Sequence, residues 1–263
     1  MCLCHSPRID RRTMLSLLGS ALAAPMLAGC DEGDGFPIHL VSDETVRRMG
    51  LESWQRIREK TPVSHNRELT QVLHKVGSRL LTATGEPPER WEMVVFASPE
   101  VNAFALPGGK IGVFEGMFRV VANADQLAAV VGHEIGHNQA EHSHERLSAA
   151  AAKQLGLKLV SVALQLGDIR YANEIAALLG VGVEFGLELP YSRRQELEAD
   201  RLGLFTMAKA RFDPRQAVDL WRRMDRIAAQ RVPAFLSTHP APEARIAAIE
   251  KLLPEVAQVA QRG

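Results

Sequence analysis

Three side chains in one short stretch could together bind a metal ion and catalyse hydrolysis. His133, Glu134 and His137 form the pattern H-E-x-x-H. On a helix, residues four positions apart lie on the same face, so both imidazoles can reach one ion while the carboxylate projects beside it. Two neutral nitrogen ligands and a carboxylate that can deprotonate a water are the parts of a zinc site that cleaves peptide bonds. The pattern therefore predicts metal-assisted hydrolysis.

The H-E-x-x-H pattern can also occur by chance, but independent signals predict that it lies on a helix. Val130 and Val131 precede the motif and would bury the helix beside a core. Asn123, followed three residues later by Gln126, fits a capping box that starts a helix. We expect this helix to begin near residue 123 and to continue to about residue 166.

Two more histidines follow the motif on the expected helix. His142 would be turned away from the face that carries His133 and His137, and His144 would lie two turns further along that face. Neither could share an ion with the motif in this geometry. Both are therefore expected to be exposed to solvent.

A third protein ligand must come from elsewhere in the chain, with a fourth coordination position left open for water. About sixty residues downstream, Ser192 is expected to open a second helix that carries Glu196 and Asp200 on one face. One of these carboxylates could bind zinc while the other holds a metal-binding histidine through its second ring nitrogen. Glu198 falls on a different side of the helix and is expected to be a solvated charge.

Short apolar and alternating runs between residues 91 and 114 predict a small β-sheet. The runs cover residues 91–97, 102–106 and 111–114, and Pro107-Gly108-Gly109 forms a turn between the last two. An ordinary core hairpin would give the same pattern. A strand can, however, pack one face against a core and still present its edge to a substrate.

These segments resemble a known family. H-E-I-G-H at 133–137 followed by E-L-E-A-D at 196–200 resembles the gluzincin metallopeptidases of family forty-eight, the group of the CAAX prenyl endopeptidases, the HtpX heat-shock proteases and the BepA-like proteases. The segment 102–116, upstream of the motif, is similar to the family's strand segment. T-H-P at 238–240 with R-I at 245–246 is similar to its C-terminal segment. The resemblance covers about residues 40 to 255, with four motifs in the family's order.

The resemblance implies a zincin-like metallopeptidase domain in an α+β, mainly helical fold, with the small β-sheet beside the H-E-x-x-H helix. It implies that His133, His137 and Glu196 bind one zinc ion per chain, and that Asp200 supports a histidine ligand. In related zincins an extended substrate adds to an unpaired strand edge. The expected substrate-binding residues are Asn102, Ala103 and Phe104.

The resemblance also implies the catalytic roles. Zinc would polarise the scissile carbonyl and acidify a water, and Glu134 would take the proton and pass it to the leaving amine. His239 is expected near the metal, where it could donate to the developing oxyanion or occupy the fourth zinc position in a resting state. Arg245 could hold the loop of His239 or contact substrate.

The N-terminal segment has the features of a targeting sequence. Residues 1–29 contain R-R at 11–12 and an apolar run, and L-A-G-C at 27–30 resembles a bacterial lipoprotein box. Cleavage before Cys30 would leave its thiol for lipid attachment, with residues 30–40 as a Gly- and Asp-rich tether. We expect export by the Sec or twin-arginine route and a periplasmic, lipid-anchored protein at the cell membrane or outer membrane. An uncleaved membrane helix is the alternative, but the run is shorter than the ~20 residues that span a bilayer.

Composition limits the remaining classes of function. Lys+Arg and Asp+Glu both number 31 and no basic run is interleaved with aromatics, so we do not expect nucleic-acid binding. The catalytic domain is expected at 41–255, followed by a C-terminal tail at 256–263. Charges interrupt the apolar stretch 155–189, which favours helices packed on the domain, or covering its cleft, over a membrane span.

Export and tethering imply that the substrates are misfolded or unassembled cell-envelope proteins. Two alternatives stay open. One is a chaperone-like module of the envelope that binds clients and rarely cuts them. The other is a zinc enzyme that hydrolyses a bond other than a peptide bond.

Overall fold

The structure is a computed structural model that describes residues 40–152, 190–230, 232–240 and 242–262. The expected signal peptide, the lipidation site Cys30, most of the tether and the apolar stretch 155–189 lie outside the described residues. No helix in the described part of the chain is long and apolar enough to cross a membrane.

A three-stranded sheet forms from the predicted alternating runs. The strands are β1 (Glu92–Phe96), β2 (Ala103–Leu106) and β3 (Lys110–Phe114). Their order is β1-β3-β2, with β3 parallel to β1 and antiparallel to β2. Gly108 and Gly109 have φ values of 92° and 73°, which explains why two glycines form the predicted turn between β2 and β3. β2 is therefore a strand at the edge of the sheet.

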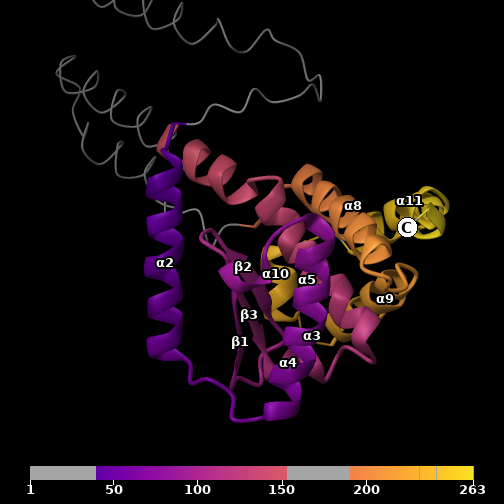
Figure 1. Ribbon diagram of the computed structural model, residues 1–263, viewed down its shortest axis with the longest axis horizontal. Helices are drawn as coiled ribbons and strands as arrows, with labels where there is room; N and C mark the ends of the chain where they lie inside the picture. The colour runs from indigo at the N-terminus through magenta and orange to yellow at the C-terminus, as the bar shows by residue number, and fades with distance from the viewer. Residues whose placement is uncertain (1–39, 153–189, 231, 241, 263) are drawn as a thin grey trace, which may run out of the picture. The chain divides into compact units, whose positions relative to one another are not determined.

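The two faces of the sheet pack against different helices, because side chains alternate along each strand. One face joins the main core with α3 (Arg67–Thr84) and α5 (Ala124–Gln139). The other face packs under α2 (Asp43–Lys60), which contributes Trp54 and Ile57 to a separate aromatic cluster. Figure 1 shows α2 on the opposite side of the strands from α3 and α5. The aromatic cluster, defined here as the α2-side cluster, consists of Trp54, Ile57, Val94, Phe96, Phe104, Leu106 and Phe114.

Two helices cross closely next to the sheet. α5 carries H-E-x-x-H, and α8 (Arg193–Lys209) carries E-L-E-A-D. Both begin at the predicted caps, since Asn123 accepts a hydrogen bond from the backbone of Gln126, and Ser192 forms a full capping box with Gln195.

Small residues let the backbones of α5 and α8 approach each other. A Cβ atom on Gly136 would lie 2.7 Å from the carbonyl oxygen of Ala199, and one on Gly203 would lie 3.0 Å from the backbone of Gly132. Larger side chains would hold the helices apart. The close crossing brings the carboxylates of α8 within reach of the imidazoles of α5.

The helix that carries the motif ends earlier than its pattern predicts. α5 ends at Gln139, and Glu141 has a left-handed φ of 53° before a second helical segment begins at residue 142. No glycine or proline marks this break in the sequence, although a left-handed conformation costs a non-glycine residue about 1–2 kcal/mol. The expectation of one unbroken helix is wrong. The turn changes the direction of the chain and brings residue 142 back towards α5.

The remaining elements complete the domain. They are η1 (Pro88–Arg90), α4 (Glu115–Phe118), α9 (Gln216–Ala228), α10 (Ala234–Thr238) and α11 (Pro242–Arg262). α11 continues past residue 255, the expected end of the domain, and Val256 is fully buried in the main core. His239 lies in the loop between α10 and α11, directly after α10 ends.

Candidate metal centre and substrate groove

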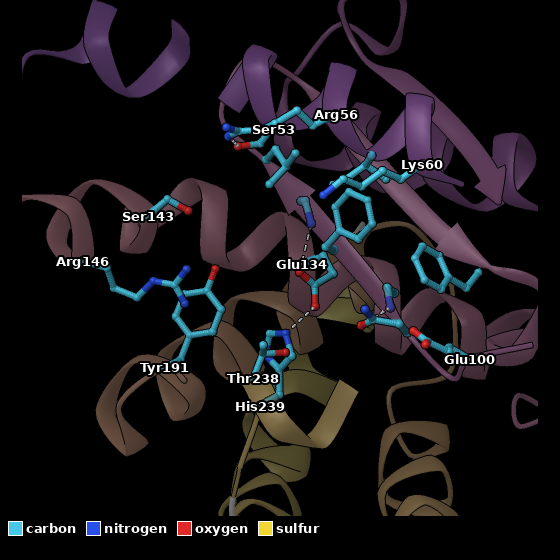
Figure 2. Close-up of a pocket in the computed structure, with 17 residues that line it drawn as sticks. Ser53, Arg56, Lys60, Glu100, Glu134, Ser143, Arg146, Tyr191, Thr238 and His239 are labelled. Carbon is cyan, nitrogen blue, oxygen red and sulfur yellow. Dashed lines mark hydrogen bonds and ion pairs between the residues drawn. The ribbon is translucent and has the colours of Figure 1, made fainter. Parts of the chain in front are cut away.

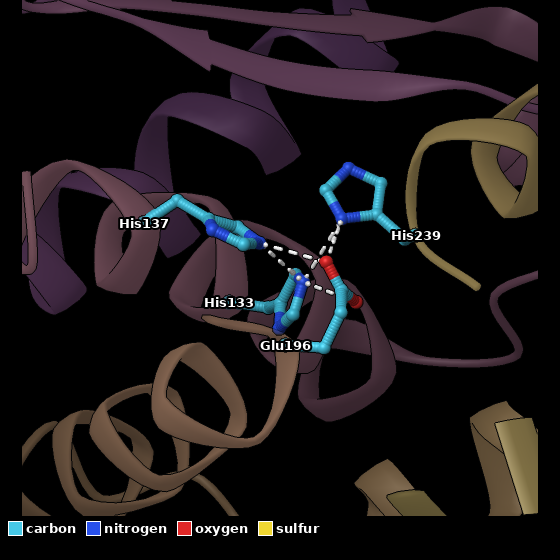
Figure 3. Close-up of side chains that lie close together, drawn as sticks. All are labelled: His133, His137, Glu196 and His239. Atoms are coloured by element: carbon cyan, nitrogen blue, oxygen red, sulfur yellow. Dashed lines mark hydrogen bonds and ion pairs between the residues drawn. The ribbon is translucent and has the colours of Figure 1, made fainter. Parts of the chain in front are cut away.

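Four candidate metal ligands from three separate segments converge in the interior. His133 and His137 come from α5, Glu196 comes from the first turn of α8, and His239 comes from the loop after α10. One donor atom from each lies within 4.8 Å of the other three. All four residues are at most 2% exposed. Figure 3 shows the four side chains pointing towards one another.

The spacing of the donor atoms fits a zinc ion. Nε2 of His137 lies 3.0 Å from Nε2 of His133 and 3.3 Å from Oε1 of Glu196. Nδ1 of His239 lies 3.2 Å from Nε2 of His133 and 3.0 Å from Oε1 of Glu196. A tetrahedral site with bonds of about 2.0 Å separates its donors by about 3.3 Å. The residues present therefore fit zinc in both chemistry and spacing.

Burial keeps the two α5 imidazoles neutral, as metal ligands must be. Loss of hydration lowers the pKa of His133 well below its usual value and lowers that of His137 to about 3. Burial alone would raise the pKa of Glu196, but the charge of Arg245 and hydrogen bonds from the histidines outweigh it and hold that pKa well below its usual value. The cluster therefore presents neutral nitrogens and one ionised carboxylate.

A carboxylate fixes the orientation of His133. Nδ1 of His133 lies 3.0 Å from Oδ1 of Asp200, four residues after Glu196 on α8. A proton on Nδ1 can be donated to Asp200, which leaves the lone pair of Nε2 directed into the cluster. The structure thus brings Asp200 to the position expected of a supporting residue.

A second chain of contacts, which the sequence did not predict, fixes His137. Its Nδ1 lies 2.8 Å from Nδ1 of His142, and Nε2 of His142 lies 3.3 Å from Oε2 of Glu198. His142 is fully buried, so the expectation that it is solvated is wrong, and the turn at Glu141 explains why. If Glu198 accepts the Nε2 proton of His142, His142 accepts in turn from His137 and leaves Nε2 of His137 free for a metal.

The other residues expected to be solvated also make specific contacts. The expectation that His144 is exposed is also wrong, because it is only 4% exposed and its ring contacts the backbone carbonyl of Val41 and the carboxylate of Asp43. The side chain of Glu198 is about half exposed, which agrees in part with the prediction that it is a solvated charge.

Arg245 contacts the cluster at His133 and Glu196 and is completely buried. It donates to both oxygens of Asp200 at 2.6 and 2.7 Å, and its Nη1 lies 2.5 Å from Oε2 of Glu196. Its guanidinium also stacks over the ring of Trp221, 3.6 Å from the centroid. Burial lowers the pKa of Arg245, but the paired carboxylates raise it further, so the side chain stays charged. Arg245 thus bridges the two acidic residues of α8 and does not line the groove described below.

Glu134 joins the metal cluster to the sheet. Its Oε2 accepts a hydrogen bond from the backbone N–H of Ala105 at 3.1 Å, and its Oε1 lies 3.3 Å from Nε2 of His239. Burial raises the pKa of Glu134 from its usual value to about 7. A carboxyl group with a pKa near neutrality is suited to accept and return a proton at physiological pH.

A groove of about 750 Å³ lies between the edge strand β2 and the metal cluster. The predicted substrate-binding residues Asn102, Ala103 and Phe104 line it, together with Glu134 and His239. Figure 2 shows Glu134 and His239 at the groove, joined by a dashed line. The structure therefore brings the predicted substrate-binding, proton-transfer and metal residues to one place.

The outer edge of β2 faces this groove. The carbonyl oxygen of Asn102 accepts from the N–H of Phe114 at 3.0 Å, and bonding residues alternate along an antiparallel pair. Ala103 and Ala105 therefore direct their backbone groups away from β3. The N–H of Ala105 donates to Glu134, and the N–H of Ala103 donates to Oδ1 of Asn102 at 3.0 Å. The outward groups left for an added strand are therefore the carbonyl oxygens of Ala103 and Ala105.

Tyr191 is a further groove residue that sequence reasoning missed. Its ring stacks on His137 with centroids 3.8 Å apart, and the guanidinium of Arg146 lies 3.8 Å from the centre of the same ring. Its backbone N–H donates to the carbonyl of Thr238, next to His239. Tyr191 precedes the N-cap of α8 and so connects the start of that helix to the His239 loop. In the sequence, only its position directly before Ser192 indicated that Tyr191 could lie near the site.

Comparisons with known proteins agree with this geometry. The model of Peptidase family M48 matches residues 67–253. The mitochondrial metalloendopeptidase OMA1 of Schizosaccharomyces pombe is 41% identical over 188 residues, which cover 71% of this chain and 53% of that protein. The beta-barrel assembly-enhancing protease of Escherichia coli is 29% identical over 251 residues, which cover 89% of this chain and 50% of that protein.

The chain spans about half the length of these relatives. The family match includes the sheet, both helices of the metal cluster and the loop of His239. The chain belongs to peptidase family M48.

Proposed function

We propose that this protein is a zinc metalloendopeptidase that cleaves extended segments of misfolded or unassembled proteins at the cell envelope. The observation that carries the proposal is the convergence of buried metal donors and Glu134 beside the outer edge of β2. Neither the metal donors nor the edge of β2 alone would favour peptides as substrates. Together they offer a place to bind a polypeptide backbone and a place to hydrolyse it.

His133, His137 and Glu196 would hold the zinc ion. When bound, zinc supplies a Lewis acid that polarises the scissile carbonyl and makes a water more acidic. The positive charge of a bound cation would also favour the ionised form of Glu134 over the protonated one. Glu134 would accept the proton of the attacking water at Oε1, the oxygen that is not held by Ala105, and return it to the leaving amine as the peptide bond breaks.

The edge of β2 supports the choice of an extended polypeptide as substrate. A strand that adds to this edge would donate main-chain N–H groups to the outward carbonyls of β2, which does not depend on its sequence, while alternate side chains enter the groove. Folded proteins rarely expose a free strand of this kind. Selection of unfolded or unassembled clients would follow from this geometry alone.

His239 would act in two states. With Nδ1 among the donors it would close the fourth coordination position, and closed tetrahedral sites are structural, not catalytic. Withdrawal of the ring would open that position, and an imidazole beside it could donate to the developing oxyanion. Because His239 lies in a loop between two helices, its movement would not require α5 or α8 to shift.

The cellular location rests on the sequence and on the relatives. The Cys30 motif and the preceding apolar run support export and a lipid anchor. The Escherichia coli and Vibrio cholerae relatives are named beta-barrel assembly-enhancing proteases, which favours clients of the cell envelope. The OMA1 relatives are named as mitochondrial metalloendopeptidases. The names of both groups of relatives therefore agree that they are proteases, but they point to different cellular compartments.

A peptide digest tests the proposal. Full-length protein would be incubated with peptides from a denatured proteome, with and without a chelator, and new termini would be read by mass spectrometry. We expect cleavage that the chelator stops and added zinc restores. Glu134→Gln should retain zinc but reduce the rate by roughly 10²- to 10⁴-fold, whereas Glu59→Gln, exposed on α2, should cut normally.

Two results would overturn the proposal. One is a zinc-loaded protein that cuts no peptide. The other is a Glu134→Gln variant that processes clients as fast as the unaltered chain, which would favour the chaperone-like alternative.

A further inference from the structure

One wall of the groove comes from α2, outside the metal-binding segments. Ser53, Arg56, Ile57 and Lys60 line the groove, and their spacing places them on one face of the helix. Figure 2 shows Arg56 and Lys60 on one side of the groove, with Tyr191 and His239 on the other. The wall is defined here as the α2 wall.

The α2 wall carries only positive charges. Arg56 and Lys60 are exposed, and Arg56 donates to Ser53 Oγ at 3.1 Å. Within the described residues no carboxylate forms an ion pair with either side chain, in contrast to Arg48 and Arg58 of the same helix. Their charges are thus available to a ligand.

Other charged residues line the groove elsewhere. Glu100 and Glu134 are acidic, and Arg146 is basic. In Figure 2 Glu100 and Arg146 lie away from Arg56 and Lys60, and Glu134, which lies between Lys60 and His239, is only 2% exposed. A ligand side chain directed at α2 would therefore meet basic groups first.

The pleat of the sheet determines which side chains of a bound strand would face the α2 wall. Phe104 and Leu106 of β2 point to the α2-side cluster, while Ala103 and Ala105 belong to the main core on the opposite face. A strand added to the edge of β2 continues the same alternation. Every second side chain would lie under Arg56 and Lys60, above an apolar floor formed by Phe104 and Phe114.

We propose that the groove selects extended peptides that carry Glu or Asp at alternate positions facing the α2 wall. The aliphatic part of such a side chain contacts the apolar floor while its carboxylate pairs with Arg56 or Lys60. This selection rests on the proposed peptide groove and adds a substrate class to it. Because both basic groups are exposed, each contributes roughly a fivefold preference at low salt, and the preference weakens as ionic strength rises.

The test compares peptides that differ at one position. A cleaved peptide would be resynthesised with Glu, Gln or Lys at each position around the cleaved bond. For the zinc-loaded, full-length chain kcat/KM would be measured, and for zinc-loaded Glu134→Gln the binding of the same peptides would be followed by fluorescence anisotropy. Glu should be preferred at alternate positions only, a period of two that a diffuse positive field would not produce.

Charge-reversed variants complete the test. The double variant Arg56→Glu, Lys60→Glu should prefer Lys at those same positions, whereas Arg48→Glu, on α2 but outside the groove, should keep the preference for Glu. Both surface variants would be compared with the unaltered chain by thermal unfolding. Cleavage without a periodic charge preference, or a preference that survives the double reversal, overturns the inference and leaves the peptidase proposal intact. Periodic, reversible binding without any cleavage supports the inference and overturns the peptidase proposal.

Discussion

The metal cluster and the α2 side of the groove meet at Glu134 and β2, yet they are built in opposite ways. In the cluster, each donor side chain is almost fully buried and held by another polar group, as His133 is by Asp200 and His137 is by His142. On the α2 side, the charged residues are exposed, and the rings of the α2-side cluster pack with centroids 5.6 to 6.2 Å apart.

This difference in burial suits the cluster to catalysis and the α2 side of the groove to substrate recognition. Buried polar groups have few alternative partners, so a change in one donor leaves others unsatisfied at a cost of several kcal/mol. Exposed charges and apolar rings exchange partners with water or with different ligands at little cost. The cluster can therefore specify one reaction, while the groove can accept many sequences with a graded preference. Substitutions should have large effects in the first region and small effects in the second.

The largest effect is expected from Glu196→Gln. An amide is a weaker ligand than a carboxylate, and it leaves the buried charge of Arg245 with one ionised partner instead of two. Zinc affinity should fall by more than about 100-fold, and zinc-dependent cleavage should be lost. Metal content after dialysis and the cleavage rate measure this. A variant that keeps one zinc per chain and its full rate would show that Glu196 is not a ligand.

The next effect is expected from Arg245→Lys. One ammonium group cannot replace a planar guanidinium that contacts Asp200, Glu196 and Trp221 together. Urea denaturation should show a loss of about 3–5 kcal/mol, as for other broken buried ion pairs, with weaker zinc binding. Arg222→Lys is the control, because Arg222 pairs with Glu250 at the surface and its change should cost at most about 0.5 kcal/mol. Equal stability of the two variants would mean that the buried bridge is not structurally important.

Much of this site follows from the sequence because its residues lie on regular elements. Helical spacing places His133 and His137 on one face, and it places Glu196 and Asp200 on another, so local rules suffice. The hairpin of β2 and β3 follows from alternation and from two glycines in a turn. The pairing of the two helices does not follow from local rules, and the resemblance to a family supplied it.

The missed residues depend on irregular backbone. His142 is buried only because Glu141 adopts a left-handed conformation, which its residue type does not favour. Tyr191 reaches His137 from a position just before the helix, where no periodicity applies. The basic α2 wall could not be predicted from the sequence either, because exposed Arg and Lys on a helix normally indicate only a solvated face.

A smaller effect is expected where the two helices cross. The Cβ of Gly136→Ala would lie 2.7 Å from the carbonyl oxygen of Ala199, so α5 and α8 must separate and the donors must move apart. Thermal and urea unfolding should show a loss of about 1–3 kcal/mol, with weaker zinc binding.

Gly132→Ala is the matched control for this crossing. Its Cβ would meet the nearest atom of Gly203 at 3.4 Å, an ordinary contact, and alanine favours the helix by roughly 1 kcal/mol. It should be neutral or stabilising and should bind zinc normally. If both alanine variants behave alike, the close approach at Gly136 does not set the geometry of the cluster.

The smallest effect is expected in the groove, and it tests whether recognition is separate from chemistry. Phe104→Ala removes a half-buried ring from the groove floor but leaves the backbone edge of β2 and the Ala105 contact with Glu134 in place. KM for peptides should rise roughly threefold to tenfold with little change in kcat, because the lost contact is made equally in the ground state and the transition state. Phe205→Ala, on α8 and outside the groove, should leave KM unchanged. A fall in kcat with KM unchanged would instead mean that Phe104 contributes to the catalytic step. In that case β2 would take part in catalysis, and the metal cluster and the binding groove would not have separate roles.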